Sequence, residues 1–314
     1  MNILITGAAG NLGGFLARHL LAYSGHKLLL MRHKTALAPD LLGPRSEERV
    51  CDLADPGSAA EACLGADVVM HFAGKLFSPH PESFLPTTNA LYAKHLVDGA
   101  LGAGVKKFIL ISFPHVEGPT SAEAPCRGRL DGSPVSVHAQ TRLAAERYLF
   151  EAAASSKMQA VSLRPGMVYG RDVLMLAFAR RLARWGLLGV WRSPTPIHVI
   201  SLWDFNECCR AAIEKDVSGV FPLGDDAPTT LQEFLNGCCA HWGVGRPWRV
   251  PVWGVYAAAW ICEGLAGVVG CGTPFTVDFI RIGRVPYFCD TRRMKEELGV
   301  RVRYRGWKEG LGTI

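Results

Sequence analysis

The chain has 314 residues, of which 49% are hydrophobic and 20% charged, and its formal net charge is +6. This composition is that of an ordinary globular protein and excludes a fibrous or disordered chain, while the length allows one large domain or two moderate ones. The basic excess is modest and no nucleic-acid-binding motif accompanies it, so we expect no nucleic-acid partner.

The first half of the sequence alternates short apolar runs with longer stretches of helical periodicity, which predicts parallel strands joined by crossover helices. Expected strands are residues 2–6, 27–31, a strand ending at 50, 66–72, 106–112 and 159–165, and expected helices cover 12–20, 85–103 and 138–154. We therefore predict an α/β fold with a doubly wound, Rossmann-like parallel sheet.

After Pro165 the alternation becomes less regular. Expected helices are residues 172–185, 202–214, 229–242, 252–269 and 291–298, with short strands at 197–200 and 220–223. We predict that residues 1–165 form a dinucleotide-binding domain and that residues 166–314 form mainly a smaller C-terminal substrate lobe, with some exchange of segments. This lobe should cover the carboxyl ends of the strands, where open parallel sheets bind ligands.

The N-terminus begins directly with the apolar strand pattern MNILIT, which leaves no room for a cleaved leader. The ten cysteines show no CxxC spacing and no histidine cluster with metal-ligand spacing accompanies them. We therefore expect a cytoplasmic protein with free thiols and without a bound metal.

The strongest motif lies between the first strand and the first helix, where Gly7, Gly10 and Gly13 form a GxxGxxG pattern that also contains Asn11 and Leu12. Glycines in this context allow a tight turn, a close approach of the backbone to a pyrophosphate, and close packing of helix on strand. The motif predicts a dinucleotide cofactor bound by these five residues.

This N-terminal pattern resembles the extended short-chain dehydrogenase/reductase family, which includes NAD(P)-dependent epimerases, dehydratases and hydroxysteroid dehydrogenases. Further segments resemble family motifs in the same order along the chain, and the resemblance implies that they contact the cofactor. They are Asp52 and Leu53 after the third strand, the loop of Phe72, Ala73 and Gly74, the helical Asn89, and Pro165, Gly166 and Val168 of the RPGMVYG segment. The resemblance also implies a homodimer formed through a pair of helices.

The residues after the second strand bear on the choice of cofactor. Dehydrogenases that prefer NAD commonly place a carboxylate there, whereas this chain has Arg32, His33 and Lys34. Because no acid follows the strand, we expect NADP(H) to be preferred, with Arg32 as the main contact of the 2′-phosphate and His33 assisting. NAD(H) remains an alternative, and so does a simple solvated loop.

Residues 136–149, SVHAQTRLAAERYL, resemble the family's catalytic helix except at its two reactive positions. The resemblance implies a tyrosine and a lysine four residues apart, and this chain has His138 and Arg142 there. Residues four apart share one helical face, so the two side chains should lie together. The family's serine in the preceding turn is replaced by Phe113, which cannot donate a hydrogen bond, and Ser112 is adjacent.

Two hypotheses follow from this altered triad. In the first, the protein is an NAD(P)-dependent oxidoreductase or epimerase that acts on a hydroxyl or carbonyl of a small, hydrophobic substrate. His138 would exchange the proton, Arg142 would bind the nicotinamide ribose, and Ser112, Ser136 or His115 would orient the substrate. In the second, hydride chemistry is lost and the protein is a catalytically silent NADP(H)-binding sensor or scaffold.

One apolar stretch, residues 250–272, is nearly long enough to span a bilayer. It contains Glu263 and five glycines, and a carboxylate at the centre of a bilayer is costly. We expect a buried or ligand-covering helix, and peripheral membrane contact stays open. The tryptophans of this half should line a hydrophobic cavity or belong to the core, and those considered are Trp185, Trp191, Trp253 and Trp260.

Overall fold

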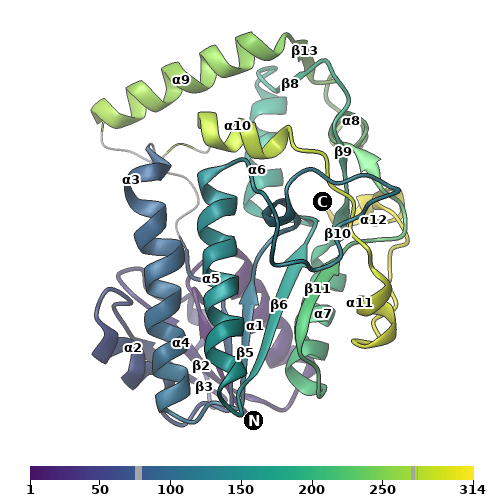
Figure 1. Ribbon diagram of the computed structural model, residues 1–314. Coiled ribbons are helices and arrows are strands. Elements are labelled where there is room, and N and C mark those ends of the chain that lie inside the picture. Colours follow the sequence, from purple (N-terminus) through teal and green to yellow (C-terminus); the bar gives the residue numbers. More distant parts are fainter. Residues whose placement is uncertain (75–79, 270–272, 274) are drawn as a thin grey trace.

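The computed structural model describes residues 1–74, 80–269, 273 and 275–314 (Figure 1). Within these ranges, seven parallel strands form one sheet in the order β11-β6-β5-β4-β1-β2-β3. The strands are β1 (Asn2–Thr6), β2 (Lys27–Arg32), β3 (Ser46–Val50), β4 (Val68–His71), β5 (Lys107–Ile111), β6 (Gln159–Pro165) and β11 (Gly219–Leu223). This order confirms the predicted doubly wound, Rossmann-like sheet.

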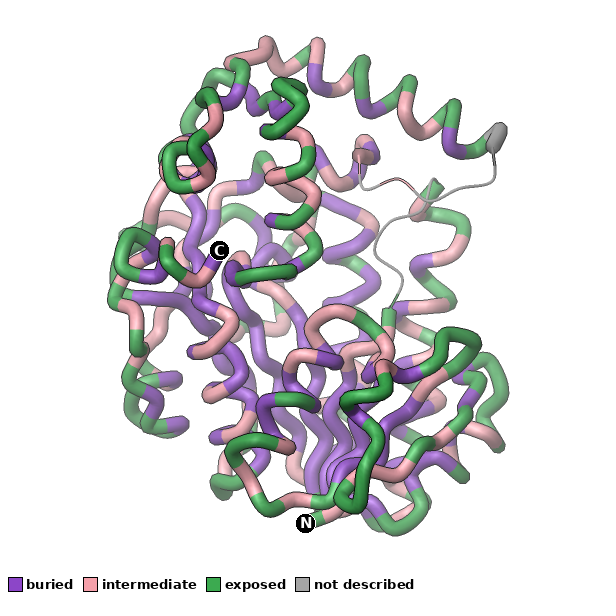
Figure 2. Tube along the Cα trace, turned by 180° about the vertical axis from the view of Figure 1, so that it is seen from behind, coloured by how far each residue is buried: buried purple, intermediate pink, exposed green. Residues whose placement is uncertain are grey.

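Helices cover both faces of the sheet (Figure 1). Ile3 and Ile5 of β1 point to the face covered by α1 (Asn11–Tyr23) and α7 (Leu202–Glu214). Leu4 points to the opposite face, which is covered by α2 (Pro56–Cys63), α4 (Tyr92–Gly102) and α5 (Val137–Ala154). Successive side chains of a strand point to opposite faces, so a sheet buried on both faces requires a continuous apolar run. Figure 2 shows the buried centre of the sheet, and β1, β4, β5, β6 and β11 are almost wholly buried, whereas the edge strand β3 is partly exposed.

The remaining elements form short connections and the C-terminal part of the molecule. Short helices of the first half are η1 (Pro39–Leu41), α3 (Pro81–Leu85), η2 (Pro86–Leu91) and η3 (Pro114–Glu117). The later helices are α6 (Leu174–Arg184), α8 (Leu231–His241), α9 (Val252–Val269), α10 (Val277–Gly283), α11 (Arg292–Glu296), α12 (Trp307–Gly310) and η4 (Leu311–Thr313). Three strand pairs accompany them: β7 (Met167–Tyr169) with β10 (Val199–Ser201), β9 (Pro196–Ile197) with β12 (Thr229–Thr230), and β8 (Gly189–Trp191) with β13 (Trp248–Val250).

Two expected elements differ from the structure. The helix expected over 85–103 begins earlier, at Pro81, and passes through a π-helical segment, η2, before α4. The strand expected over 197–200 is broken at His198, because β9 and β10 pair with different partners. The buried His198 explains this break. Its ring accepts a hydrogen bond from the Cys289 amide at 3.0 Å and lies 2.8 Å from the carbonyl oxygen of Asp225.

Segments from the second half return to the sheet. β11 pairs with β6, and α7 packs against β5 and β6. Conversely, Cys126 forms an isolated bridge with Cys289, so residues of the first half reach the C-terminal part. The boundary at residue 165 stays a prediction.

The apolar stretch 250–272 forms α9, and residues 270–272 lie outside the described residues. Across the described part of the chain, no helix is long and apolar enough to cross a membrane.

Candidate active site

The candidate site lies at the carboxyl ends of β1, β4 and β5, where the strand order reverses direction between β1 and β4. Thr6 closes β1, and its hydroxyl lies 2.8 Å from Nδ1 of His71 at the end of β4. The same oxygen accepts hydrogen bonds from the amides of Phe72 and Ala73 at 3.1 Å. His71 is therefore a buried histidine that contacts Thr6, and the Thr6 hydroxyl fixes the loop after β4.

The glycine loop has the backbone geometry that the motif requires. Gly7 has a φ of 70°, in the left-handed region that favours glycine. A Cβ on Gly13 would lie 2.4 Å from the carbonyl oxygen of Gly7, so only glycine fits there. Gly10 precedes α1 and no side chain caps that helix, which leaves its first amides available to an anion.

Asn11 and Leu12 both contact other parts of the chain, so neither side chain is free as in an open loop. The Asn11 carboxamide donates to the Asp172 carbonyl at 2.8 Å and accepts from the Leu174 amide at 2.9 Å. The side chain expected to contact the cofactor thus already ties α1 to the start of α6. Leu12 packs against the core.

The residues after β2 and β3 are those expected to contact the adenosine half of the cofactor. Arg32 forms an ion pair with Glu48 of β3, a residue that the sequence analysis did not consider. Parallel pairing of β2 with β3 explains this contact, because Leu30 stands opposite Glu48 and Arg32 lies two residues further along its strand. His33 lies 3.8 Å from Asp52, and both side chains are exposed. No acid follows β2 in the sequence, but the fold brings Glu48 of β3 to Arg32. Leu53 is buried beside this loop.

Gly74, Asn89 and Arg142 come together, although they belong to three separate segments. A Cβ on Gly74 would lie 3.1 Å from Nη2 of Arg142 and 3.2 Å from Oδ1 of Asn89. Asn89 is fully buried on the π-helical segment and donates to the Thr141 hydroxyl at 3.2 Å. π-helical segments often occur at functional sites.

Several buried polar atoms around this point have no hydrogen-bond partner among the described residues: Nε and Nη1 of Arg142, Oδ1 of Asn89, Nε2 of His71 and Oγ of Ser112. Buried polar groups are normally paired, so such a cluster suits a polar ligand. The ribose hydroxyls and carboxamide of a nicotinamide nucleotide offer the donors and acceptors that these atoms lack. The residues present therefore fit the cofactor.

His138 lies in the first turn of α5, one turn before Arg142, and both side chains are buried. Ser136 caps this helix by accepting from the Ala139 amide at 3.2 Å. Asp278 of α10 accepts from the Val137 amide at 3.3 Å. The C-terminal part of the chain thus holds the beginning of the helix that carries His138.

His138 is the first of four neighbouring rings that contact one another in turn. Its ring centroid lies 5.4 Å from that of Phe113, which lies 5.4 Å from that of His115. The His115 ring is in turn 4.5 Å from that of Tyr287. Phe113 is therefore a neighbour of His138 from the segment after β5.

Burial dominates the electrostatics of these groups. It lowers the pKa of His138 to about 3, and the nearby Arg142 and His115 lower it further. Burial likewise lowers the pKa of His115 to about 3 and that of Arg142 to about 10. At neutral pH the imidazole of His138 is therefore neutral while Arg142 remains protonated.

The RPGMVYG segment is largely structural. Pro165 ends β6, and a Cβ on Gly166 would lie 2.2 Å from the carbonyl oxygen of His198. Val168 belongs to the core. The predicted cofactor contacts of these three residues stay predictions, and the glycine at 166 has a packing reason of its own.

Sequence reasoning missed a buried ionic network beneath α5. Arg164 donates to Glu117 at 2.6 Å and to Glu146 at 3.0 Å, and all three side chains are at most 1% exposed. Glu117 also accepts from the amides of Gly128 and Arg129 at 2.7 and 3.0 Å. Glu146 follows Arg142 by four residues, a spacing that could have signalled a supporting carboxylate.

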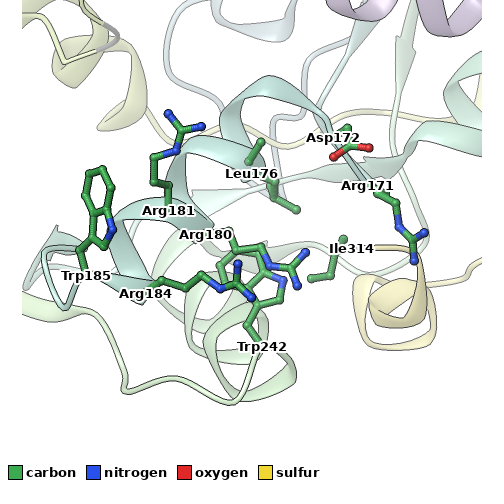
Figure 3. Close-up of a pocket in the computed structure, with 11 residues that line it drawn as sticks. Arg171, Asp172, Leu176, Arg180, Arg181, Arg184, Trp185, Trp242 and Ile314 are labelled. Carbon is green, nitrogen blue, oxygen red and sulfur yellow. The ribbon is translucent and has the colours of Figure 1, made fainter.

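A separate cavity of about 460 Å³ lies beside α6, and its lining includes Arg180, Arg181, Arg184 and Trp242 (Figure 3). His138 and Arg142 do not line it. The guanidinium of Arg180 lies 5.9 Å from the Trp242 ring centroid. In the described part of the chain, no group of three or more His, Cys, Asp and Glu side chains could hold a metal ion.

Comparisons with known proteins match this geometry. Residues 3–196 match the model of the NAD dependent epimerase/dehydratase family. Over 116 residues the chain is 35% identical to a uronate dehydrogenase of Pseudomonas syringae pv. tomato, covering 37% of this chain and 41% of that protein. It is 26% identical over 286 residues to a 2-alkyl-3-oxoalkanoate reductase of Shewanella oneidensis, covering 82% and 71% of the two chains.

Among solved structures, the Thermus thermophilus UDP-glucose 4-epimerase in complex with NAD aligns with a TM-score of 0.79 and 19% identity, over 100% of this chain and 97% of that one. At this identity the likeness shows the fold alone. The matched region spans about two fifths of the uronate dehydrogenases' length.

Proposed function

The chain belongs to the NAD dependent epimerase/dehydratase family, and from that premise we propose that it is an NAD(P)-dependent oxidoreductase or epimerase. Its substrate would be a small, hydrophobic molecule with a reactive hydroxyl or carbonyl. The observation that carries the proposal is the pairing of His138 with Arg142 on α5, next to a cluster of buried polar atoms without partners.

The proposed chemistry assigns one task to each of these residues. Bound NAD(P) supplies or accepts the hydride. In alcohol oxidation His138 would take the hydroxyl proton on its neutral imidazole, and in carbonyl reduction it would return that proton. Arg142 stays protonated and would donate hydrogen bonds to ribose oxygens, which would satisfy its buried Nε and Nη1. Ser112 would donate to the substrate oxygen.

NADP(H) remains our preferred cofactor, although solved structures with this fold contain NAD. Arg32 and His33 lie where a 2′-phosphate is expected, and a guanidinium suits phosphate. The ion pair of Arg32 with Glu48 opposes this preference, because a 2′-phosphate would have to compete with the carboxylate. Asp52, Leu53, Phe72 and Ala73 are proposed to line the remainder of the nucleotide site.

The substrate class is inferred from the site and from relatives. Phe113 packs against His138 and against the aliphatic cluster of Val116, Ala139 and Leu143, and Tyr287 packs against His115. This apolar environment favours an apolar substrate. A relative named 2-alkyl-3-oxoalkanoate reductase, which matches most of this chain, supports the same class. The name uronate dehydrogenase supports instead a polar sugar acid.

A catalytically silent NADP(H)-binding sensor or scaffold is the second candidate. Two observations favour it: Phe113 fills the position of the usual serine, and a pKa of about 3 makes His138 a weak base. The same buried atoms would then bind the dinucleotide without turnover.

One experiment separates the two candidates. NADPH and NADH are titrated calorimetrically, and oxidation of bound NADPH is then followed by stopped flow against a panel of hydrophobic ketones. An enzyme oxidises bound NADPH, and His138→Phe abolishes oxidation while binding persists. Binding without oxidation supports the sensor, and failure to bind either dinucleotide contradicts both. The variant Gly13→Asp should lose binding in either case.

We also propose an oligomeric state and a location. A homodimer through α4 and α5 fits their position side by side on one outer face (Figure 1), and sedimentation velocity tests it. A cytoplasmic location fits the free state of the nine cysteines in the described residues.

A further inference from the structure

Helix α9 has an exposed face without charge. It lies along the outermost end of the molecule, with α10 on its inner side (Figure 1). The large side chains on its exposed face are Trp253, Trp260, Ile261 and Leu265. The helix carries one charged residue, Glu263, which is partly buried. Apolar patches of this kind normally mark an interaction surface.

The apolar surface continues from α9 onto the neighbouring loop. β13, which precedes α9, pairs with β8, and the indole of Trp248 donates to the Gly186 carbonyl at 2.8 Å. Trp185 and Leu187, on either side of Gly186, are exposed. The chain has eight tryptophans, and the four that are exposed all lie here: Trp185 and Trp248 at 67%, Trp260 at 72% and Trp253 at 75%.

Basic residues border this surface. The sequence contains four arginines and no acid between Val173 and Trp203, and Arg246 and Arg249 precede α9. Arg181, Arg184, Arg192 and Arg246 are exposed, and no ion pair involves them among the described residues. Figure 3 shows Arg181 and Arg184 beside Trp185.

We propose that this end of the molecule docks on the surface of a phospholipid bilayer with anionic headgroups. The docking surface consists of the outer face of α9 together with Trp185, Leu187 and Trp248. Tryptophan places its apolar ring at the boundary of the acyl region and its N–H among the headgroups. Helices with an apolar face lie in this plane, and neighbouring arginines attract anionic phosphates.

The inference goes beyond the proposed function and does not depend on it. It also brings the membrane close to the candidate site. α9 packs against α10, and Asp278 of α10 accepts from the first turn of the helix that carries His138. An apolar substrate dissolved in the bilayer would therefore have a short path to this region.

Vesicle flotation tests the proposal on the full chain. The probes are vesicles of phosphatidylcholine alone and of phosphatidylcholine with 30% phosphatidylglycerol. The wild type should float with the anionic vesicles, and raised salt should weaken the association. Leu265→Glu places a charge on the docking surface and should reduce the bound fraction at least tenfold. The matched control Leu64→Glu alters a similarly exposed leucine at the C-terminus of α2 and should float like the wild type.

Four outcomes overturn the proposal. The first is no flotation of the wild type with anionic vesicles. The second is equal loss in both leucine variants. The third is that the wild type does not float but forms an oligomer in sedimentation velocity, and that Leu265→Glu dissociates this oligomer. That result would assign the surface to contacts between copies of the chain. Quenching of tryptophan emission by brominated lipid needs no variant, and absence of quenching in the wild type also overturns the proposal.

Discussion

The ring of Phe113 lies 5.4 Å from the imidazole of His138, centroid to centroid. An aromatic ring thus stands where the related enzymes are expected to have a hydroxyl that holds the substrate oxygen. The contact keeps water from His138 and contributes to the burial that lowers its pKa.

Replacing Phe113 with serine should improve catalysis and weaken the fold. Phe113→Ser adds a donor for the substrate oxygen, so kcat/KM for ketone reduction should rise by about fivefold, as expected for a hydrogen bond worth roughly 1 kcal/mol. Loss of the ring should destabilise the protein by about 2–3 kcal/mol. Phe113→Ala is the control, since it opens the same space without a donor. A rise as large in the alanine variant would show that space alone was limiting.

Arg142 and Arg164 are both buried, yet their removal should have opposite effects. Arg164 is fully paired, so Arg164→Met should destabilise the protein by about 3–5 kcal/mol because it strands two buried carboxylates. Two nitrogens of Arg142 have no hydrogen-bond partner among the described residues, so Arg142→Met should stabilise the cofactor-free protein by about 1–3 kcal/mol and abolish protection by NADPH. Urea unfolding with and without NADPH measures both. Equal destabilisation would refute a ligand site at Arg142.

Acidification should destabilise the protein through its buried histidines. Burial lowers the pKa of His71, His115 and His138 from the ordinary 6.5 to about 3. The unfolded chain then binds more protons between these values, so stability is full above pH 6.5 and is lost as the pH falls toward 3. Each histidine contributes up to about 1.4 kcal/mol per pH unit. Urea unfolding between pH 7 and 5 measures how steeply the free energy of unfolding changes with pH. His138→Gln should reduce that slope by the equivalent of one proton taken up on unfolding. An unchanged slope would contradict the burial of a neutral imidazole.

A methyl group at Gly13 should damage the glycine loop. The added Cβ would lie 2.4 Å from the Gly7 carbonyl oxygen, so Gly13→Ala should cost about 2 kcal/mol or more and weaken dinucleotide binding at least tenfold. Gly102→Ala is the matched control, because its Cβ would meet open space at the end of α4 and should stabilise by up to about 1 kcal/mol. Thermal unfolding and NADPH titration are the measurements. Normal NADPH affinity in Gly13→Ala would place the cofactor elsewhere.

Cofactor choice should respond to the pair of Arg32 and Glu48. Glu48→Gln frees the guanidinium, so the affinity for NADPH should rise relative to NADH. Arg32→Ala should lower NADPH affinity by about tenfold and leave NADH nearly unchanged. Calorimetric titration of both nucleotides with each variant gives the ratio. If Arg32→Ala weakens the binding of both nucleotides equally, Arg32 does not recognise the 2′-phosphate.

Local pattern was sufficient for much of this molecule. The apolar runs and the GxxGxxG loop predicted the strands of the central sheet, the sheet type and the constraint at Gly13, because periodicity and backbone conformation are properties of neighbouring residues. The short strands β7, β8, β12 and β13 were not predicted. The ends of α7, α9 and β6 agree with the sequence for the same reason. Helix periodicity also placed His138 and Arg142 on one face.

Contacts between distant segments needed the tertiary structure. The pairing of β2 with β3 brings Glu48 to Arg32, and the return of the C-terminal part brings Asp278 to α5. The prediction that Trp253 and Trp260 line a cavity or belong to the core was wrong, because apolar side chains look alike in sequence whether they face a neighbour or solvent. Sequence by itself determined the sheet and the glycine loop, which depend on local conformation. Only the folded chain decided which polar atoms are buried without partners and which apolar face is exposed, since both depend on what packs against them.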